Sequence, residues 1–226
     1  MKYNNMLEAR FLARPNRFIA YIEVDGKEEI CHVKNTGRCK ELLISGCTIY
    51  VQHHDNEKRK TKYSLIAVKK GELLINMDSQ APNKVVQEWL KEKQPFGHMT
   101  LLKPEYTHGD SRFDFYLETE AKKMFVEIKG VTLEEDGVVK FPDAPTERGA
   151  KHVRELAELA QEGYECAIIF VVQMSGMKYF TPNWQTHAEF GEALGNAKNA
   201  GVQIYAYECD VEVDSLNITK EIPVKL

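Results

Sequence analysis

The chain has 226 residues, of which 43% are hydrophobic and 28% charged, and its net charge is −4. This composition is typical of a globular protein with one large or two small domains, and it excludes disordered and fibrous chains. No apolar run approaches the ~18 residues of a membrane span, and the first residues contain no apolar signal-peptide block. The five cysteines form no CxxC pair, which argues against a disulfide framework. We therefore expect a cytoplasmic protein with no membrane partner.

The charges are unevenly distributed along the chain. Residues 1–81 contain 14 Lys and Arg against 10 Asp and Glu, a net charge of +4, and the remainder contains 16 against 24, a net charge of −8. The first third is therefore suited to binding phosphate groups, whereas an acidic site in the rest would need cations.

Six short segments with strand character, separated by turn residues, fill the first third of the chain. They cover residues 7–13, 18–24, 29–33, 47–53, 63–69 and 72–77. A short helix is predicted over residues 39–44, between the third and fourth segments. A small β-rich unit with one helix in the middle favours an OB-like barrel, and an SH3-like barrel is the alternative.

Basic and aromatic residues gather at the turns of this unit. OB barrels bind nucleic acids through basic loops and through aromatic rings that stack on bases. The alternative is that these turns are basic only because they are exposed to solvent. The residues that we expect to bind nucleic acid here are Arg14, Arg17, Phe18, Arg38, Arg59, Lys60, Lys62 and Tyr63.

A polar, proline-containing stretch at residues 78–82 is the predicted linker, so we expect one domain over residues 1–81 and another over residues 82–226. Asn83 is the expected N-cap of a helix that continues to about Lys93. A strand over residues 99–106 follows.

Residues 111–118 and 123–129 both alternate apolar and polar residues, which predicts two strands of a hairpin. If the turn is centred between them, cross-strand partners have numbers that sum to 241, which places Asp114 opposite Glu127. Directly paired residues share one face of a sheet, with Cβ atoms ~5 Å apart. On this register one face carries Arg112, Asp114, Glu127 and Lys129, and the other, core face carries Phe113, Phe115, Leu117, Val126 and Ile128.

Two carboxylates at this distance repel each other and need a positive counter-charge. A divalent cation such as Mg²⁺ or Mn²⁺ would supply it, because these ions take carboxylate, water and phosphate oxygens as ligands. Lys129 could then hold or deprotonate an attacking water molecule. The alternative is that Arg112 and Lys129 neutralise the acids by themselves, as an ordinary surface ion-pair network.

The remaining residues continue the alternation of helices and strands. A helix at about 146–162 ends at a glycine, and residues 166–172 are almost wholly apolar, as in a strand buried on both faces. The other predicted elements are a hairpin of residues 130–133 and 138–141, a loop with Pro182 and Trp184, a helix near 187–199, and strands over 202–213 and 218–224.

Asp114 followed by Glu127-Ile128-Lys129 resembles the D…ExK signature of the PD-(D/E)xK nuclease superfamily, although Phe113 stands where that signature has proline. The resemblance implies that Asp114, Glu127 and the carbonyl group of Ile128 bind Mg²⁺ and that Lys129 positions the hydrolytic water. The first helix of such nucleases often supplies an extra acid, which makes Glu88 a further candidate metal or water ligand.

The run FPDAPTERGAKH at residues 141–152 resembles the signature of the sugar fermentation stimulation protein A (SfsA) family, and so do segments near residues 14, 35, 111 and 126. The resemblance implies an α/β protein with an N-terminal OB-like barrel and a C-terminal restriction-endonuclease-like domain with a mixed sheet. It also implies DNA binding and a regulatory role in sugar (maltose) metabolism. Thr146 would cap the helix, and Arg148, Lys151 and His152 would line the groove beside the metal and neutralise the phosphate. Arg112, Arg148 and Lys151 are therefore further residues that we expect to bind nucleic acid. The alternative for each is an ordinary surface charge, and for His152 a packing role.

Two functions follow from this reading. The first is a DNA-binding protein with a metal-dependent phosphodiesterase site at Asp114, Glu127 and Lys129. The second is a catalytically silent DNA-binding transcriptional regulator on a nuclease scaffold. An RNA-binding OB protein is a third alternative, and the sequence leaves a homodimer open.

Overall fold

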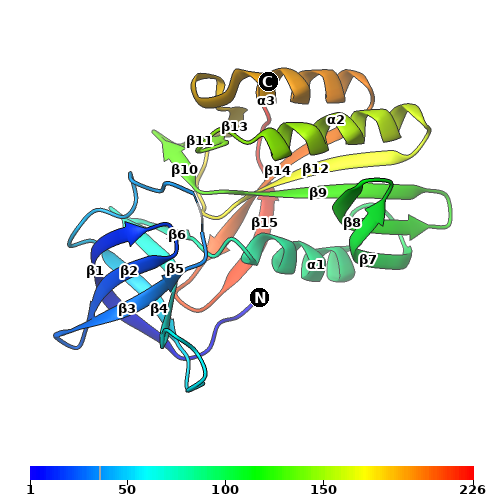
Figure 1. The fold of residues 1–226 in the computed structure, drawn as a ribbon. Helices are drawn as coiled ribbons and strands as arrows, with labels where there is room; N and C mark the ends of the chain where they lie inside the picture. The colour runs from blue at the N-terminus through cyan, green and yellow to red at the C-terminus, as the bar shows by residue number, and fades with distance from the viewer. Residues whose placement is uncertain (36) are drawn as a thin grey trace.

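The N-terminal third of the chain is a closed β-barrel in the computed structural model, which describes residues 1–35 and 37–226. Strands β1 to β5 follow the order β3-β2-β1-β4-β5, and a parallel pairing of β3 with β5 closes the ring (Figure 1, blue to cyan). The predicted OB-like barrel is therefore confirmed. The strands are β1 (Met6–Asn16), β2 (Ile19–Val24), β3 (Lys27–Val33), β4 (Thr48–His53), β5 (Tyr63–Lys70) and β6 (Leu73–Asn76), the last an extension beside β5.

Alternating apolar residues fill the barrel. In β2, Ala20 and Ile22 are completely buried while Tyr21 between them is exposed, as the two-residue repeat of a strand requires. The predicted helix at residues 39–44 is wrong, because the segment makes only a single turn in which the Leu42 and Leu43 N–H groups donate to the Cys39 carbonyl. Cys39 has a φ of 44°, a left-handed conformation that a right-handed helix cannot contain.

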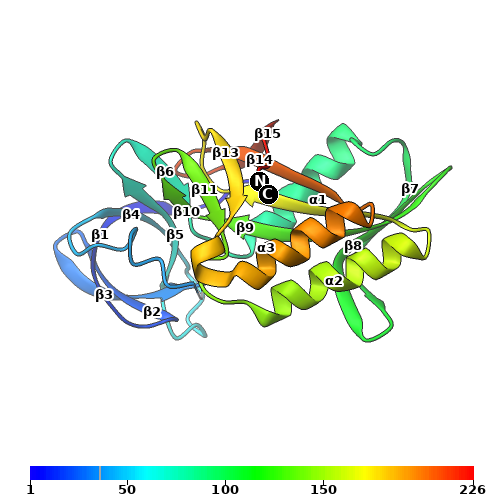
Figure 2. The same cartoon turned by 90° about the horizontal axis from the view of Figure 1, so that it is seen from above.

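The C-terminal domain is a six-stranded mixed sheet covered by helices on both faces. The strand order is β15-β14-β12-β9-β8-β7, with β12 parallel to β9 and β14. Helix α1 covers one face, and α2 and α3 lie together on the other (Figures 1 and 2). In the described part of the chain no helix is both long enough and apolar enough to cross a membrane. The elements are α1 (Ala81–Lys93), β7 (Met99–His108), β8 (Ser111–Thr119), β9 (Lys123–Val131), β10 (Leu133–Glu135), β11 (Val138–Phe141), α2 (Glu147–Gln161), β12 (Glu165–Val172), β13 (Tyr179–Pro182), α3 (Trp184–Asn199), β14 (Gln203–Val211) and β15 (Leu216–Glu221).

Two predicted boundaries in this domain are wrong. Gln80 occupies the N-cap position of α1 without a side-chain capping bond, so Asn83 lies within the first turn of the helix. The first turn tolerates Pro82 because its N–H groups have no helical partner. The segment expected as a loop contains β13, which pairs in parallel with β11. Four residues with a proline at the end give no strand signal until their partner is known.

The central hairpin has the predicted register, since Phe115 pairs with Val126 and Leu117 with Met124. The prediction that Phe113 shares their face is wrong. Its ring packs 5.2 Å from Phe125 on the α2 side, whereas Phe115 belongs to the core beneath α1. Glu105 of the neighbouring strand β7 has a φ of 51° at this point, so β7 departs from extended geometry there, although its register with β8 does not shift between the Pro104–Phe115 and Tyr106–Phe113 pairs.

The predicted linker is part of a packed interface between the two domains. Asp78 is completely buried, and its carboxylate accepts a 2.7 Å hydrogen bond from Lys34 Nζ of the barrel. The Lys70 ammonium donates to Glu134 Oε2 at 2.6 Å across the same interface. These contacts hold the barrel against the sheet domain in one arrangement.

Candidate metal and phosphate site

The candidate site lies where two neighbouring strands separate. The ladder between β8 and β9 ends at Phe115 and Val126, while β9 continues beside β12, with Glu127 opposite Ile168. The separation leaves a cavity of about 240 Å³, which the N-terminus of α2 borders. Its lining residues are Glu105, Arg112, Phe113, Asp114, Glu127, Ile128, Lys129, Thr146, Arg148, Gly149 and His152.

Asp114 is held from two sides. Its Oδ1 accepts a hydrogen bond from Asn83 Nδ2 of α1, and its Oδ2 accepts one from the Ile128 backbone N–H, both at 2.7 Å. Burial, and then the charge of Glu127, raise the pKa of Asp114, while the two hydrogen bonds and Lys129 act in the opposite direction. The hydrogen bonds fix the orientation of the carboxylate, but burial and the charge of Glu127 outweigh them and Lys129, so the ionised form of Asp114 is less stable here than in water.

Glu127 is only 3% exposed. Its Oε1 accepts hydrogen bonds from Lys129 Nζ and from His152 Nδ1, each at 2.6 Å. Burial alone would raise the pKa of Glu127, but the hydrogen bonds and charges of His152 and Lys129 outweigh it and hold the pKa below its usual value. The other oxygen, Oε2, is buried and has no hydrogen-bond partner among the described residues.

Positive groups surround the mouth of this cavity. Arg112 and Arg148 are both exposed and line it, and Arg112 lies 3.7 Å from Glu105. Thr146 caps α2, since its side chain accepts the Gly149 N–H at 3.1 Å. The free N–H groups of a helix N-terminus attract anions, so this side of the cavity is suited to a phosphate group.

Two predicted residues lie away from the cavity. Glu88 forms an ion pair with the N-terminal ammonium of Met1 at 2.8 Å and does not line the cavity. Lys151 is exposed and pairs with Glu155 at 3.3 Å. The contact from α1 comes instead from Asn83, for which the sequence suggested only a capping role. His152, which the family resemblance placed beside the metal, does line the cavity. It is a polar residue on the buried face of α2, together with Val153 and Leu156.

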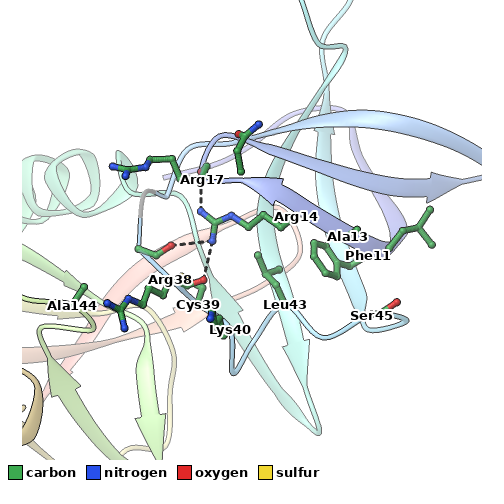
Figure 3. A pocket seen from close by; sticks show the side chains of 13 residues that line it. Phe11, Ala13, Arg14, Arg17, Arg38, Cys39, Lys40, Leu43, Ser45 and Ala144 are labelled. Carbon is green, nitrogen blue, oxygen red and sulfur yellow. Dashed lines mark hydrogen bonds between the residues drawn. The ribbon is translucent and has the colours of Figure 1, made fainter.

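The barrel residues predicted to bind nucleic acid have three different environments. Arg14 is not free, because its guanidinium donates to the carbonyls of Arg17, Asn35, Gly37 and Arg38; the bonds to Arg17 and Arg38 are drawn in Figure 3. Tyr63 is 9% exposed and packs on His53, and Arg59 donates to Ser64 Oγ of β5. Arg59 is nevertheless exposed, and so are the other candidates, Arg17, Phe18, Arg38, Lys60 and Lys62.

The fold and the site place the chain in a class of two-domain proteins, in which an OB barrel is joined to a mixed-sheet α/β domain that holds a buried pair of acids. Two family models match the chain, "SfsA N-terminal OB domain" over residues 12–77 and "Sugar fermentation stimulation protein RE domain" over residues 80–215. The chain belongs to the SfsA family of sugar fermentation stimulation proteins.

Individual relatives agree with this assignment over the full length. The chain is 58% identical to the sugar fermentation stimulation protein homolog of Clostridium beijerinckii, with 100% of each chain covered. It is 54% identical to that of Ruminiclostridium cellulolyticum, again with 100% coverage of both. A solved structure of Pyrococcus furiosus SfsA in complex with Ca²⁺ is 26% identical and superposes with a TM-score of 0.91 over 100% of this chain and 98% of that one.

Proposed function

We propose that the chain is a DNA-binding protein with a Mg²⁺- or Mn²⁺-dependent phosphodiesterase site at Asp114, Glu127 and Lys129. The observation that carries this proposal is the buried Oε2 of Glu127, which has no hydrogen-bond partner in the described part of the chain and lies in a cavity that Asp114 also lines. A buried carboxylate oxygen without a partner is costly. The second carboxylate in this cavity, that of Asp114, has a raised pKa, so its ionised form is also unfavourable. A cation bound between the two carboxylates would stabilise both.

The donor set fits a hard divalent ion. Asp114 and Glu127 would hold it with the Ile128 carbonyl, because Mg²⁺ and Mn²⁺ prefer oxygen ligands. When bound, such an ion polarises a phosphoryl oxygen and lowers the pKa of a coordinated water. The related P. furiosus protein is described in complex with Ca²⁺, another ion of this type.

The chain's own residues perform the remaining tasks. Lys129 Nζ, now 2.6 Å from Glu127, lies beside the acids and would position the attacking water. His152 keeps Glu127 oriented through its 2.6 Å contact. Arg148 and the N-terminus of α2 would neutralise the phosphate, since charge-assisted hydrogen bonds to phosphate are strong.

One observation favours the second candidate, a silent DNA-binding regulator of sugar metabolism. Lys129 and His152 already compensate the charge of Glu127 without any metal. In that case the acids, the lysine and the histidine form a buried structural network, and the fold serves only to bind DNA.

Cleavage and binding assays separate the two. Labelled single- and double-stranded DNA and RNA are incubated with the protein in Mg²⁺, Mn²⁺ or EDTA. We expect metal-dependent cleavage that Asp114→Asn and Lys129→Met abolish and that Lys123→Met, on the exposed far end of the same strand, leaves intact. Binding without cleavage in every condition would refute the phosphodiesterase and support the regulator.

Binding is expected to weaken steeply with salt, because contacts to phosphates release counterions. An affinity that does not change with salt would contradict nucleic-acid binding through exposed basic residues.

A further inference from the structure

A second and larger cavity, of about 690 Å³, lies on the barrel and is separate from the acid-lined one. We propose that it binds one unpaired nucleotide, with the base on its apolar side and the phosphate on Arg17 and Arg38. The ligand preferred by this protein would then be a nucleic acid with a single-stranded segment. This inference rests on the proposed function in so far as both require a nucleic acid, but it makes no use of the metal or of cleavage.

The lining of the barrel cavity divides into an apolar and a cationic part. Phe11 and Cys39 are buried at its base, and Leu43 is partly buried there. Arg17 and Arg38 are exposed, and in Figure 3 their guanidinium groups extend toward the side on which Ala144 lies, whereas Phe11 lies on the other side. A ligand that matches this division has a flat, weakly polar body and an anionic group at one end.

Arg14 holds the cavity in shape. Its four bonds, of 2.6 to 3.0 Å, join the turn after β1, through the Arg17 carbonyl, to residues 35, 37 and 38. The arginines that remain free, Arg17 and Arg38, are carried by the two segments that Arg14 connects. A site whose backbone is already fixed loses less entropy on binding, so Arg14 is a positioning residue for the other two.

A nucleotide fits better than other anions of similar size. Cavities of ~300–1,000 Å³ enclose ligands of this class, and guanidinium groups both grip phosphates and stack on bases. Just outside the lining residues, Phe18 is 51% exposed, with Arg17 Cζ 6.0 Å from its ring centroid. Such an exposed ring is a stacking platform for a neighbouring base.

The ligand must be unpaired for a steric reason. In a duplex the bases are stacked inside, and a base enters a protein pocket only after it has left the stack. A blunt duplex could therefore touch the rim arginines with its phosphates but could not reach Phe11 or Leu43.

One short segment of the chain, residues 144–148, contributes lining residues to both cavities. Ala144 lines the barrel cavity and Thr146 and Arg148 line the acid cavity, while the Arg38 N–H donates to Asp143 Oδ2 at 3.0 Å. Four residues span at most ~14 Å, which is about four nucleotides at the ~3.4 Å rise of a stacked strand. One strand can thus occupy both cavities, with the phosphate side of the barrel cavity directed to the acids.

The test measures binding in EDTA, so that no cleavage takes place. Fluorescence anisotropy is recorded for labelled single strands of about two to twelve nucleotides, for a blunt duplex and for the same duplex with a single-stranded overhang; a nucleoside monophosphate is titrated as competitor. We expect affinity to rise with strand length and to level off near about four to six nucleotides. The overhang should bind at least about tenfold more tightly than the blunt duplex.

Variants assign the effect to the barrel cavity. Arg38→Ala and Arg17→Ala should each weaken single-strand binding by about tenfold, and Ala13→Trp, which fills the cavity without removing a charge, should do the same. Arg10→Ala, an exposed arginine of the same strand that does not line the cavity, should leave affinity unchanged. If the nucleoside monophosphate competes with the strand, and Arg38→Ala abolishes this competition, the cavity binds free nucleotides as well as single strands.

The proposal is overturned if the blunt duplex binds as tightly as the overhang, or if Ala13→Trp has no effect on any ligand. These results are distinguishable from failure of the proposed function. Length-dependent, cavity-dependent binding without cleavage in Mg²⁺ or Mn²⁺ would remove only the phosphodiesterase. Cleavage that is indifferent to Arg17→Ala, Arg38→Ala and Ala13→Trp would remove only the nucleotide cavity.

Discussion

Replacing Asp114 with asparagine is expected to stabilise the metal-free protein while it removes the metal site. Burial and the Glu127 charge raise the pKa of Asp114, so the ionised form is unfavourable in the folded state. Asparagine keeps the contacts, because its carbonyl can accept the Ile128 N–H while its amide donates to the Asn83 side chain after that amide has turned over.

The size of the effect follows from the charges nearby. Carboxylates shift each other's pKa at separations of ~4–6 Å, and at an effective dielectric constant of ~20 two such charges repel by about 3–4 kcal/mol. Lys129, which lies beside both, offsets part of this, which leaves a net gain of about 1 kcal/mol on removal of the Asp114 charge. For a chain of this length the midpoint of thermal unfolding should rise by about 2–4 °C.

The assay is thermal unfolding followed by circular dichroism, in EDTA and in Mg²⁺ or Mn²⁺. At a metal concentration about a hundredfold above Kd, the wild-type protein should gain ~2.7 kcal/mol and the variant should gain nothing. Asp110→Asn, at the exposed turn between β7 and β8, is the matched control and should behave as wild type in both conditions.

Two results would refute this reasoning. A fall of several degrees in EDTA would show that the Asp114 charge stabilises the fold and needs no cation. An equal metal-induced shift in the variant and the wild type would place the metal elsewhere.

Three further predictions concern residues around the two cavities and the domain interface. Burial would raise the pKa of Glu134, but hydrogen bonds and the charge of Lys70 outweigh it and hold this pKa below its usual value. The ionised Glu134 side chain therefore stabilises the fold above the usual carboxyl pKa. This stabilisation is lost as the pH falls through the lower pKa of the folded state. Glu134→Gln should therefore cost about 1–3 kcal/mol at neutral pH, and a difference from wild type that persists in unfolding curves at acid pH would contradict this. Arg14→Lys should lower the free energy of unfolding, measured in urea, by about 3 kcal/mol, because one ammonium cannot reach all four carbonyls. A urea midpoint equal to that of Arg17→Lys would show that the four hydrogen bonds of Arg14 contribute nothing to stability. His152→Ala should weaken Mn²⁺ binding by about 10–100-fold in calorimetry, because Glu127 loses the partner that orients it, and an unchanged affinity would make His152 a packing residue only.

Much of the architecture was predictable from local patterns. The two-residue repeats in 111–118 and 123–129 predicted the central hairpin and its register, which depends only on the position of the turn. The turn spacing and short strands of the first third predicted the barrel. These features depend on neighbours in the sequence, or on one pairing that a turn determines.

Other features required partners that are distant in the chain. Residues 166–172 are apolar throughout, but the sequence does not say that β12 lies between β9 and β14. The sequence also does not show that the Arg14 guanidinium donates to four backbone carbonyls, whereas the side chain of Arg17, three residues later, is exposed. Both are basic residues near the end of the first strand, and only the folded positions of residues 35, 37 and 38 distinguish them.

The candidate site shows the same division. The spacing of Asp114, Glu127 and Lys129 was sufficient to expect two acids and an amine close together, because a strand and its hairpin partner determine that proximity. The sequence alone did not determine that Asn83 and His152 hold those acids or that Glu88 is turned toward Met1. Those contacts depend on how α1 and α2 pack across the two faces of the sheet, and helix packing is decided by the shape and burial of many side chains at once.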